Sequence, residues 1–298
     1  MKWNSEQVPR LRGVLAVVTG ANSGIGLQTA RILAQHGVRV ILACRNQERA
    51  AAALATILEA APGATVETSE LNLADLASIE AFSKRLGATE TQLDLLINNA
   101  GVMMPKRRTE TADGFELQIG VNHLGHFALT HQLLPILNNA PAARVVTVAS
   151  LAHYKGRMNL DDLHYKDRTY WRVGSYGQSK LANLLFTFEL DRRLKAAGER
   201  TIALASHPGW TSTDLQRHMP GPGAALFRAI AMSAARGALP SLRAATDENV
   251  SGGEYFGPKG MTGTHGFPVL VGCSKAARDL KTAAKLWEIS EKMTRIST

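Results

Sequence analysis

Short apolar runs alternate with longer segments of helical periodicity along most of the chain. Continuous apolar runs are typical of strands buried on both faces, and their alternation with helices is typical of parallel strands joined by crossover helices. Helical spacing follows Gly24, and an Ala-rich helical segment extends to about Ala61. The apolar runs predict strands at residues 13–18, 39–43, 64–68, 93–97, 144–149 and 201–205.

The remaining pattern continues this order without a linker. A Pro/Gly-rich stretch at residues 218–223 interrupts it only locally, helical periodicity resumes over residues 224–245, and residues 254–256 predict a last short strand. Because crossovers are right-handed, these elements predict a single α/β domain, a doubly wound sheet of about seven mainly parallel strands with helices on both faces. Residues 274–293 predict a terminal helix with inward positions at Leu280, Ala284, Leu286 and Ile289.

The chain of 298 residues carries a formal net charge of +9, which could attract a nucleic acid or an anionic membrane. However, Lys and Arg are spread along the chain in short groups such as 106–108 and 192–193, and no basic run is interleaved with aromatic residues. We therefore expect a cationic solvated surface and no nucleic-acid partner.

The two cysteines, Cys44 and Cys273, cannot build a disulfide framework or a common zinc site. Residues 1–10 lack signal-peptide character, and no apolar run is long enough to cross a bilayer. We therefore expect a cytoplasmic protein without membrane insertion. We also expect no metal site, because metal-ligand spacing and carboxylate neighbours are missing around the histidines, which are His123, His126, His153 and His207.

A glycine-rich segment, Thr19-Gly-Ala-Asn-Ser-Gly-Ile-Gly26, joins the first predicted strand to the first helix. Absent side chains permit a tight turn and close approach of a pyrophosphate, and the helix N-terminus supplies amides and positive potential. The alternative is a glycine-bearing loop without a ligand. The segment predicts a dinucleotide site whose contacts are Gly20, Asn22, Ser23, Gly24, Ile25 and Gly26.

The end of the second predicted strand favours NADP(H) over NAD(H). An acidic residue there would bind a ribose 2′-hydroxyl, whereas an Arg would accept a 2′-phosphate. This chain has Cys44 and Arg45, so no carboxylate repels the phosphate and a guanidinium can bind it in a forked geometry. The alternative is an ordinary surface arginine.

A Tyr and a Lys stand four positions apart in Tyr176-Gly-Gln-Ser-Lys180. This spacing places both side chains on one helix face, where an ammonium can stabilise tyrosinate and favour proton transfer. The same pair also occurs by chance on solvated helix faces.

Several motifs stand in the order of one family: the glycine-rich segment, Asn98-Asn-Ala-Gly101, Val121-Asn-His-Leu-Gly-His-Phe127, a strand that ends in Ser150, Tyr176-x-x-x-Lys180 and His207-Pro-Gly209. Through this order, over nearly its full length, the chain resembles the short-chain dehydrogenases/reductases and is similar to their retinol-dehydrogenase-like branch. The resemblance implies one Rossmann-like, NADP(H)-binding domain over residues 1–298.

The resemblance implies a catalytic tetrad of Asn122, Ser150, Tyr176 and Lys180. Tyr176 would be the acid/base, Ser150 would hydrogen-bond the substrate oxygen, and Lys180 would hold the nicotinamide ribose and lower the pKa of Tyr176. Asn122 would orient a water molecule in a proton relay. Taken singly, Asn122 could instead bend its helix, Ser150 could cap a strand end and Lys180 could be a solvated cation.

The resemblance also implies further cofactor contacts. Asn72 stands where the family often has an Asp that contacts adenine, and its side chain presents donors as well as an acceptor. Asn98 could equally stabilise a strand end. The segment from Pro208 could be a plain turn. The implied contacts are Asn72, Leu73, Asn98, Ala100, Gly101, Tyr176, Lys180, Pro208, Gly209 and Thr213.

Two segments are candidates for the substrate pocket, residues 151–175 and residues 215–245. By the resemblance, helices around residues 115–137 and 176–194 could pair between subunits as a homodimer or homotetramer, although their apolar positions also suit docking onto the sheet. The implied activity is hydride transfer between NADP(H) and a small-molecule alcohol or carbonyl compound of apolar character. The alternative is an NADP(H)-binding sensor or scaffold protein with little or no catalysis.

Overall fold

The computed structural model describes residues 2–211, 231–260 and 262–296. Its centre is one eight-stranded sheet in the order β3-β2-β1-β4-β5-β6-β7-β8. Neighbouring strands are parallel from β3 to β7, and β8 is antiparallel to β7. The strands are β1 (Leu15–Thr19), β2 (Arg39–Cys44), β3 (Val66–Glu70), β4 (Leu95–Asn98), β5 (Arg144–Val148), β6 (Ile202–Ser206), β7 (Tyr255–Pro258) and β8 (Pro268–Leu270).

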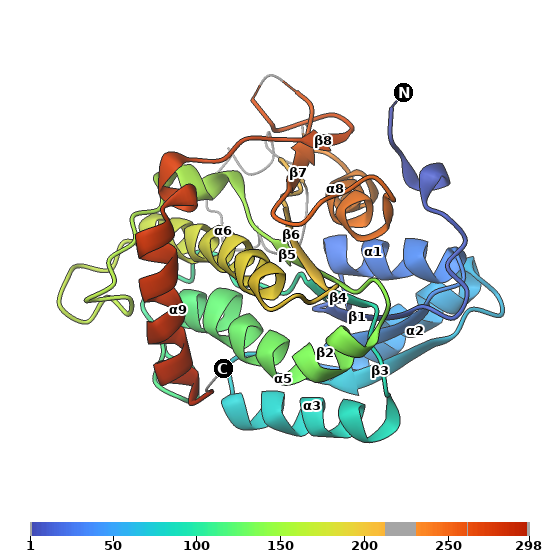
Figure 1. Ribbon diagram of the computed structural model, residues 1–298, viewed down its shortest axis with the longest axis horizontal. Coiled ribbons are helices and arrows are strands. Elements are labelled where there is room, and N and C mark those ends of the chain that lie inside the picture. The colour runs from blue at the N-terminus through green and yellow to red at the C-terminus, as the bar shows by residue number, and fades with distance from the viewer. Residues whose placement is uncertain (1, 212–230, 261, 297–298) are drawn as a thin grey trace.

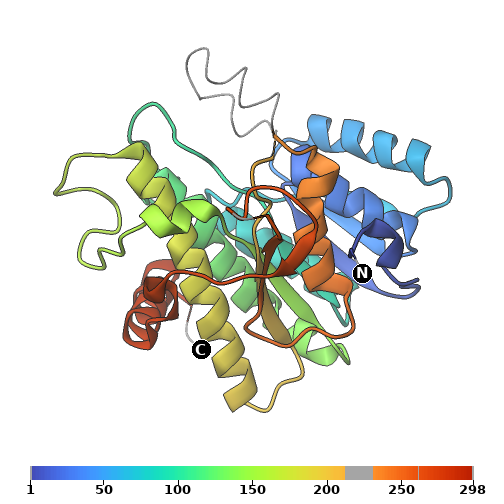
Figure 2. The same cartoon turned by 90° about the horizontal axis from the view of Figure 1, so that it is seen from above.

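Helices cover both faces of the sheet (Figure 1), which confirms the predicted doubly wound, Rossmann-like α/β fold. One face carries α1 (Gly24–Gln35), α2 (Gln47–Ala60) and α8 (Ala234–Thr246). The other carries α3 (Leu76–Thr89), α5 (Gly125–Asn139) and α6 (Arg172–Ala196), and α9 (Leu280–Thr294) packs on α5 and α6. Figure 2 shows the same layers from above. Shorter turns are η1 (Ser5–Gln7), α4 (Leu117–Ile119), η2 (Gly120–Leu124), η3 (Leu151–Lys155) and η5 (Lys275–Arg278).

Strand β1 shows why an unbroken apolar run specifies this arrangement. Successive side chains of a strand point to opposite faces. Ala16 and Val18 therefore join the core under α1 and α8, whereas Leu15 and Val17 join the core under α3 and α5. All four are buried, so both faces of the strand gain from removal of apolar surface from water.

The predicted terminal helix differs from the structure at its start. Residues 275–278 form the separate turn η5, and α9 begins at Leu280 because the carboxylate of Asp279 accepts a hydrogen bond from the Thr282 amide at 2.6 Å. The inward position predicted for Leu280 is wrong, since its side chain is 66% exposed. Of the other predicted inward residues, Leu286 is buried, and Ala284 and Ile289 are half-buried.

The C-terminal helix covers two of the helices that the resemblance offered as a subunit interface. Trp287 of α9 packs against Phe127 of α5 and Phe186 of α6, with ring centroids 5.1 and 6.0 Å away. Arg193 lies over the same indole at 4.3 Å. Within this chain, therefore, part of that face already has an apolar cover, and a homodimer or homotetramer stays a prediction.

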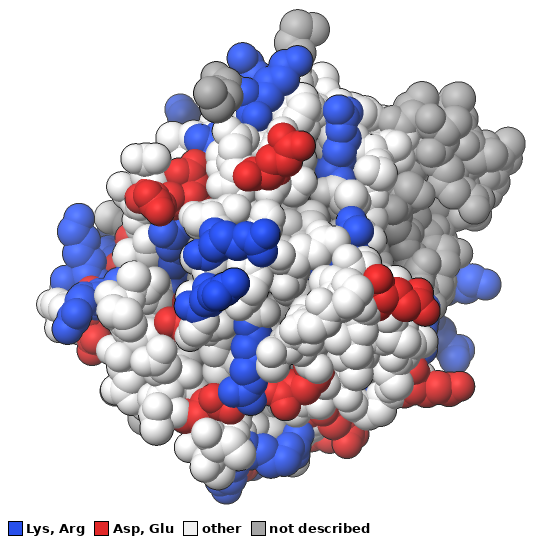
Figure 3. All heavy atoms as spheres, turned by 90° about the vertical axis from the view of Figure 1, so that its right-hand side faces the viewer, with Lys and Arg blue, Asp and Glu red and all other residues white. Residues whose placement is uncertain are grey.

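Charged side chains of both signs are interspersed on the face that Figure 3 shows. Several oppositely charged pairs are in contact, for example Arg39 with Glu67 and Glu90. Among the helices of the described ranges, none has the length and apolar character needed to cross a bilayer.

Candidate active site

A cavity of about 770 Å³ lies at the carboxyl ends of the parallel strands, where open α/β sheets bind their ligands. Most of the predicted site residues line it. These are Gly20, Asn22, Ser23, Gly24, Ile25, Gly26, Arg45, Asn72, Leu73, Ala100, Gly101, Ser150, Tyr176, Lys180, Pro208 and Gly209. Asn98 and Asn122 do not line it, and Thr213 lies outside the described residues.

The glycine-rich turn leaves no room for side chains at two of its glycines. Gly20 has a φ of +64°, which side chains disfavour, and a Cβ there would lie 2.9 Å from Cβ of Ala100. At Gly26 a Cβ would collide with the Asn99 side chain and would lie 2.6 Å from the Gly20 carbonyl oxygen. The turn therefore keeps the first amides of α1 close to the cavity, where they can bind an anion.

The end of β2 places two arginines beside the cavity. Arg45 lines it as predicted, and so does Arg49, one helical turn further along. Asn46 caps α2 by accepting from the Arg49 amide at 2.8 Å. Arg49 was not predicted, although it stands close to Arg45 in the sequence, in the first turn of the helix that follows β2.

Two adjacent asparagines at the end of β4 have different roles. Asn98 is buried and donates to Thr130 at 3.0 Å, so it stabilises the strand end, which was the alternative left open for it. Asn99 lines the cavity instead, and its amide group donates to the Thr19 carbonyl at 2.8 Å. Asn72 lines the cavity after β3, and its side-chain oxygen accepts from the Ala74 amide at 3.2 Å.

Ser150, which follows β5 and caps η3, meets Tyr176 and Lys180 of α6 at the cavity. The Lys180 ammonium donates to the Val148 carbonyl at 2.8 Å and lies 5.9 Å from the centre of the Tyr176 ring. Burial lowers the pKa of Lys180 to about 8. Burial also raises the pKa of Tyr176 to about 12, against a hydrogen bond with Ser150 that lowers it. Lys180 was expected to lower that pKa, but in this structure burial outweighs every lowering contribution.

Asn122 lies behind these residues, in the π-helical turn η2, and is fully buried. Both the oxygen and the nitrogen of its side-chain amide form hydrogen bonds. Its oxygen accepts from the Val102 amide at 2.8 Å, and its nitrogen donates to the Val102 carbonyl at 3.0 Å and to the Ser179 hydroxyl at 2.9 Å. The side chain therefore ties the segment after β4 to α6.

The rest of the cavity wall is mostly apolar, and it was not predictable from the sequence because its residues come from separate loops. From the predicted pocket segment 151–175 only three residues reach the cavity, whereas its Tyr170 turns away and donates to the buried Glu116 at 2.9 Å. Of the segment 215–245, residues 215–230 lie outside the described ranges. This part of the wall consists of Val102, Met103, Met104, Leu117, Val121, Leu151, Ala152, Lys155, Trp210 and Thr211.

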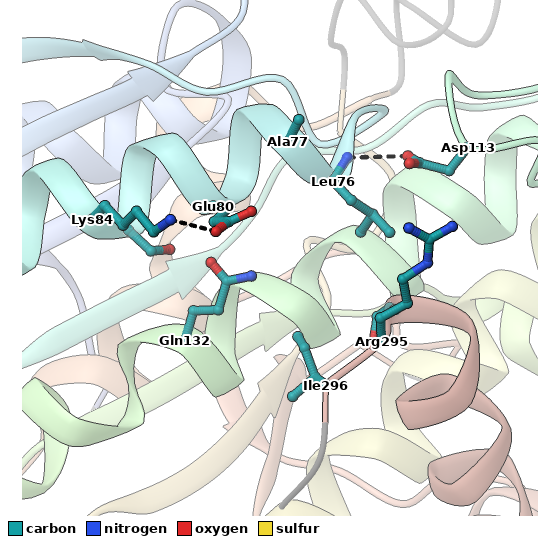
Figure 4. Close-up of a pocket in the computed structure, with 10 residues that line it drawn as sticks. Leu76, Ala77, Glu80, Lys84, Asp113, Gln132, Arg295 and Ile296 are labelled. Atoms are coloured by element: carbon teal, nitrogen blue, oxygen red, sulfur yellow. Dashed lines mark hydrogen bonds and ion pairs between the residues drawn. The ribbon is translucent and has the colours of Figure 1, made fainter.

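A second cavity of about 630 Å³ lies between α3, α5 and the end of α9 (Figure 4). Among its polar residues, Lys84 contacts Glu80 at 2.5 Å and Asp113 accepts from the Leu76 amide at 3.0 Å. Of the described residues that line it, none belongs to the predicted site. Within the described ranges, no group of three or more His, Cys, Asp or Glu side chains could hold a metal ion.

The family model described as short chain dehydrogenase matches residues 14–221, which span the strands and residues that form the first cavity. The chain belongs to this family. Members of the family are oxidoreductases, and curated relatives place the chain near the retinol dehydrogenases. It is 42% identical to human retinol dehydrogenase 12 over 285 residues, which cover 94% of this chain and 86% of that protein. It is also 42% identical to human retinol dehydrogenase 13, over 82% of this chain and 76% of that protein.

Solved structures agree with the fold. The crystal structure of an uncharacterized protein from Mycobacterium paratuberculosis has 43% identity and a TM-score of 0.85, and the match covers 100% of this chain and 99% of that one. A short-chain dehydrogenase from Shigella flexneri in complex with NADP has 22% identity and a TM-score of 0.67, over 84% of this chain and 98% of that one. The second likeness shows the fold alone.

Proposed function

We propose that the chain is an NADP(H)-dependent oxidoreductase that interconverts an alcohol and a carbonyl compound of apolar character. The observation that carries this proposal is the meeting of Ser150, Tyr176 and Lys180 on the same cavity as the glycine-rich turn of residues 20–26. A proton donor, a hydrogen-bond partner for a substrate oxygen and a dinucleotide site are thereby adjacent.

The residues present fit a nicotinamide dinucleotide. The turn at Gly20 and Gly26 leaves room for a pyrophosphate against the amides of α1, and the cavity runs from there past Ala100 to Lys180. Lys180 donates one of its three ammonium protons to the Val148 carbonyl and lines the cavity, so another proton can be donated to a ribose. When bound, the dinucleotide would supply or accept the hydride at its nicotinamide ring.

Tyr176 is suited to give a proton to a substrate oxygen. With its pKa raised to about 12 by burial, its hydroxyl is protonated at neutral pH. Ser150, which hydrogen-bonds Tyr176, can hold the same oxygen. The ammonium of Lys180 stabilises the tyrosinate that remains after transfer. Because Tyr176 is protonated, it can give a proton to a carbonyl oxygen, and carbonyl reduction is the direction to test first.

Arg45 should set the preference for NADPH. It lines the cavity at the end of β2, where a ribose 2′-phosphate would lie, and a hydrogen bond to a charged group contributes about 1.5–3 kcal/mol. We expect Arg45→Ala to weaken NADPH binding about ten- to a hundredfold and to leave NADH binding unchanged. Titration of each cofactor by fluorescence measures this effect.

Arg200→Ala is the matched control for Arg45→Ala. Arg200 is an exposed arginine before the amino end of β6, outside the cavity, so the variant loses the same charge without losing a cavity contact. If both variants weaken NADPH binding equally, the effect comes from net charge and Arg45 does not bind the 2′-phosphate.

The reaction itself can be tested by following nicotinamide absorbance for the purified protein with NADPH or NADH. The substrate panel should contain short and long aldehydes, ketones and retinal, because relatives are named retinol dehydrogenases and the cavity wall carries Met103, Met104 and Leu117. We expect turnover with NADPH that rises with the apolar length of the substrate. Saturable NADPH binding without turnover on any substrate would instead favour a cofactor-sensing role.

A further inference from the structure

A buried histidine connects the nucleotide turn to the helix that carries Asn122. His126 lies in the first turn of α5, is 1% exposed and does not line the cavity. One ring nitrogen, Nε2, is 2.9 Å from the Thr19 hydroxyl at the end of β1. The other, Nδ1, is 3.1 Å from the main-chain carbonyl of Asn122. The activity proposed above assigns no role to this ring.

The hydrogen bonds determine which nitrogen carries the proton. A carbonyl oxygen only accepts, so Nδ1 of His126 donates to Asn122. Burial, with the charge of Lys180 acting in the same direction, lowers the pKa of His126 to about 3. The ring is therefore neutral, and its Nε2 is an acceptor.

Thr19 completes this arrangement. Its hydroxyl can donate to Nε2 of His126 at 2.9 Å, whereas the other available acceptor, the Ile97 carbonyl, is 3.3 Å away. Its oxygen then accepts from the amides of Asn99 and Ala100, each at 2.9 Å. These two amides use both lone pairs of the Thr19 oxygen, so a proton on Nε2 of His126 would have no acceptor there. All donors are satisfied only if Nδ1 carries the proton.

The connection continues to the catalytic helix. The Asn122 side chain donates to the Ser179 hydroxyl at 2.9 Å, and Ser179 donates to the Tyr176 carbonyl at 2.8 Å. Hydrogen bonds therefore run from the Ala100 amide through Thr19 and His126 to the main-chain carbonyl of Asn122. From the side chain of Asn122 they continue through Ser179 to the main-chain carbonyl of Tyr176.

We propose that His126 is a positioning residue, a neutral imidazole that holds the Asn122 turn against the end of β1 and so fixes Tyr176 relative to the bound dinucleotide. This inference rests on the proposed oxidoreductase function. Small displacements of reacting groups reduce rates strongly while substrate binding changes little, so the loss should appear in kcat.

The kinetic test compares His126→Ala with His131→Ala. His131 is also buried in α5 and also donates from Nδ1 to the carbonyl four residues before it, at 2.9 Å, but its Nε2 has no hydrogen-bond partner within the described residues. We expect kcat to fall about tenfold or more in His126→Ala, with KM and the NADPH dissociation constant within about threefold of wild type. His131→Ala should keep the wild-type kcat. Equal kcat losses in the two variants would overturn the proposal.

A second variant, His126→Asn, distinguishes loss of the hydrogen bond from misfolding. The side-chain amide in His126→Asn can still donate to the Asn122 carbonyl, so this variant should keep clearly more kcat than His126→Ala at equal stability in urea. A purely structural contribution of ring volume predicts the same kcat for both, and that result would contradict a positioning role.

A spectroscopic measurement separates this inference from the proposed function. In the wild-type protein labelled with nitrogen-15 on histidine, the spectrum should show His126 protonated at Nδ1 only, with no change between about pH 6 and pH 8. An Nε2-protonated or titrating His126 would overturn the positioning role whether or not the protein reduces carbonyl compounds. If the predicted tautomer is present but no substrate is turned over, the proposed function fails, and with it the kinetic role assigned to His126.

Discussion

Replacing Tyr176 by Phe should reduce NADPH-dependent carbonyl reduction by about a thousandfold, near the middle of the range for loss of a general acid. The substitution removes only the hydroxyl, and the ring stays in a site where Tyr176 is 8% exposed. NADPH binding should change little, because the turn around Gly20 and Gly26 is untouched. Steady-state kinetics with the best substrate of the panel, together with a cofactor titration, measure both quantities.

Tyr154→Phe is the control for this variant. Tyr154 lies near the site in η3, but its side chain is 56% exposed, does not line the cavity and donates only a 3.3 Å hydrogen bond to Gly272. It should keep wild-type kcat. Retention of more than about a tenth of the activity in Tyr176→Phe would show that another group delivers the proton.

The part of the cavity lined by the glycine turn and Arg45 was predictable because it depends on local backbone geometry. A glycine turn after a buried strand, and an arginine at the end of the next strand, act at fixed sequence offsets. Gly20, Gly26 and Arg45 accordingly line the cavity. The pair Tyr176 and Lys180 was predictable for the same reason, since four residues along a helix return to one face.

Other parts of the site depend on contacts that a sequence does not display. Asn98 and Asn99 are chemically identical, and only the pairing of Asn98 with Thr130 of α5 decides which one leaves the cavity. The π-helical turn η2 directs Asn122 into the interior, toward Val102 and Ser179. The apolar wall escaped prediction since its residues come from loops far apart in the chain.

For the fold, every end of the predicted strands lies within two residues of the observed end, because burial on both faces leaves a strong pattern. Strand β8 was missed because it is three residues long and begins with Pro268. Leu280 was misplaced because the helix was predicted from residue 274, whereas Asp279 caps α9 by accepting from Thr282 and makes Leu280 its first residue.

Lys180→Met should make the protein more stable and far less active. The folded protein holds the Lys180 ammonium at 4% exposure, and burial lowers its pKa from 10.5 to about 8. A displacement of this size corresponds to a destabilisation of about 3 kcal/mol at neutral pH. Met removes that charge, and the Val148 carbonyl keeps a donor in Asn183 at 3.1 Å. Allowing for the lost hydrogen bond, we expect the unfolding free energy to rise by about 1–3 kcal/mol, and kcat to fall at least about a hundredfold.

The pH dependence of the stability difference distinguishes a buried charge from a packing effect, because a packing effect does not change with pH. Between about pH 8 and pH 10.5 the unfolded chain binds a proton at Lys180 that the folded protein has released. The unfolding free energy of the wild-type protein therefore increases with pH across this range. The advantage of Lys180→Met should therefore be full below about pH 8 and disappear toward about pH 10.5. Urea unfolding at both ends of this window measures it, with Lys195→Met, an exposed position on the same helix, as control. An advantage that stays constant with pH would mean that side-chain packing, and not a buried charge, separates the two proteins.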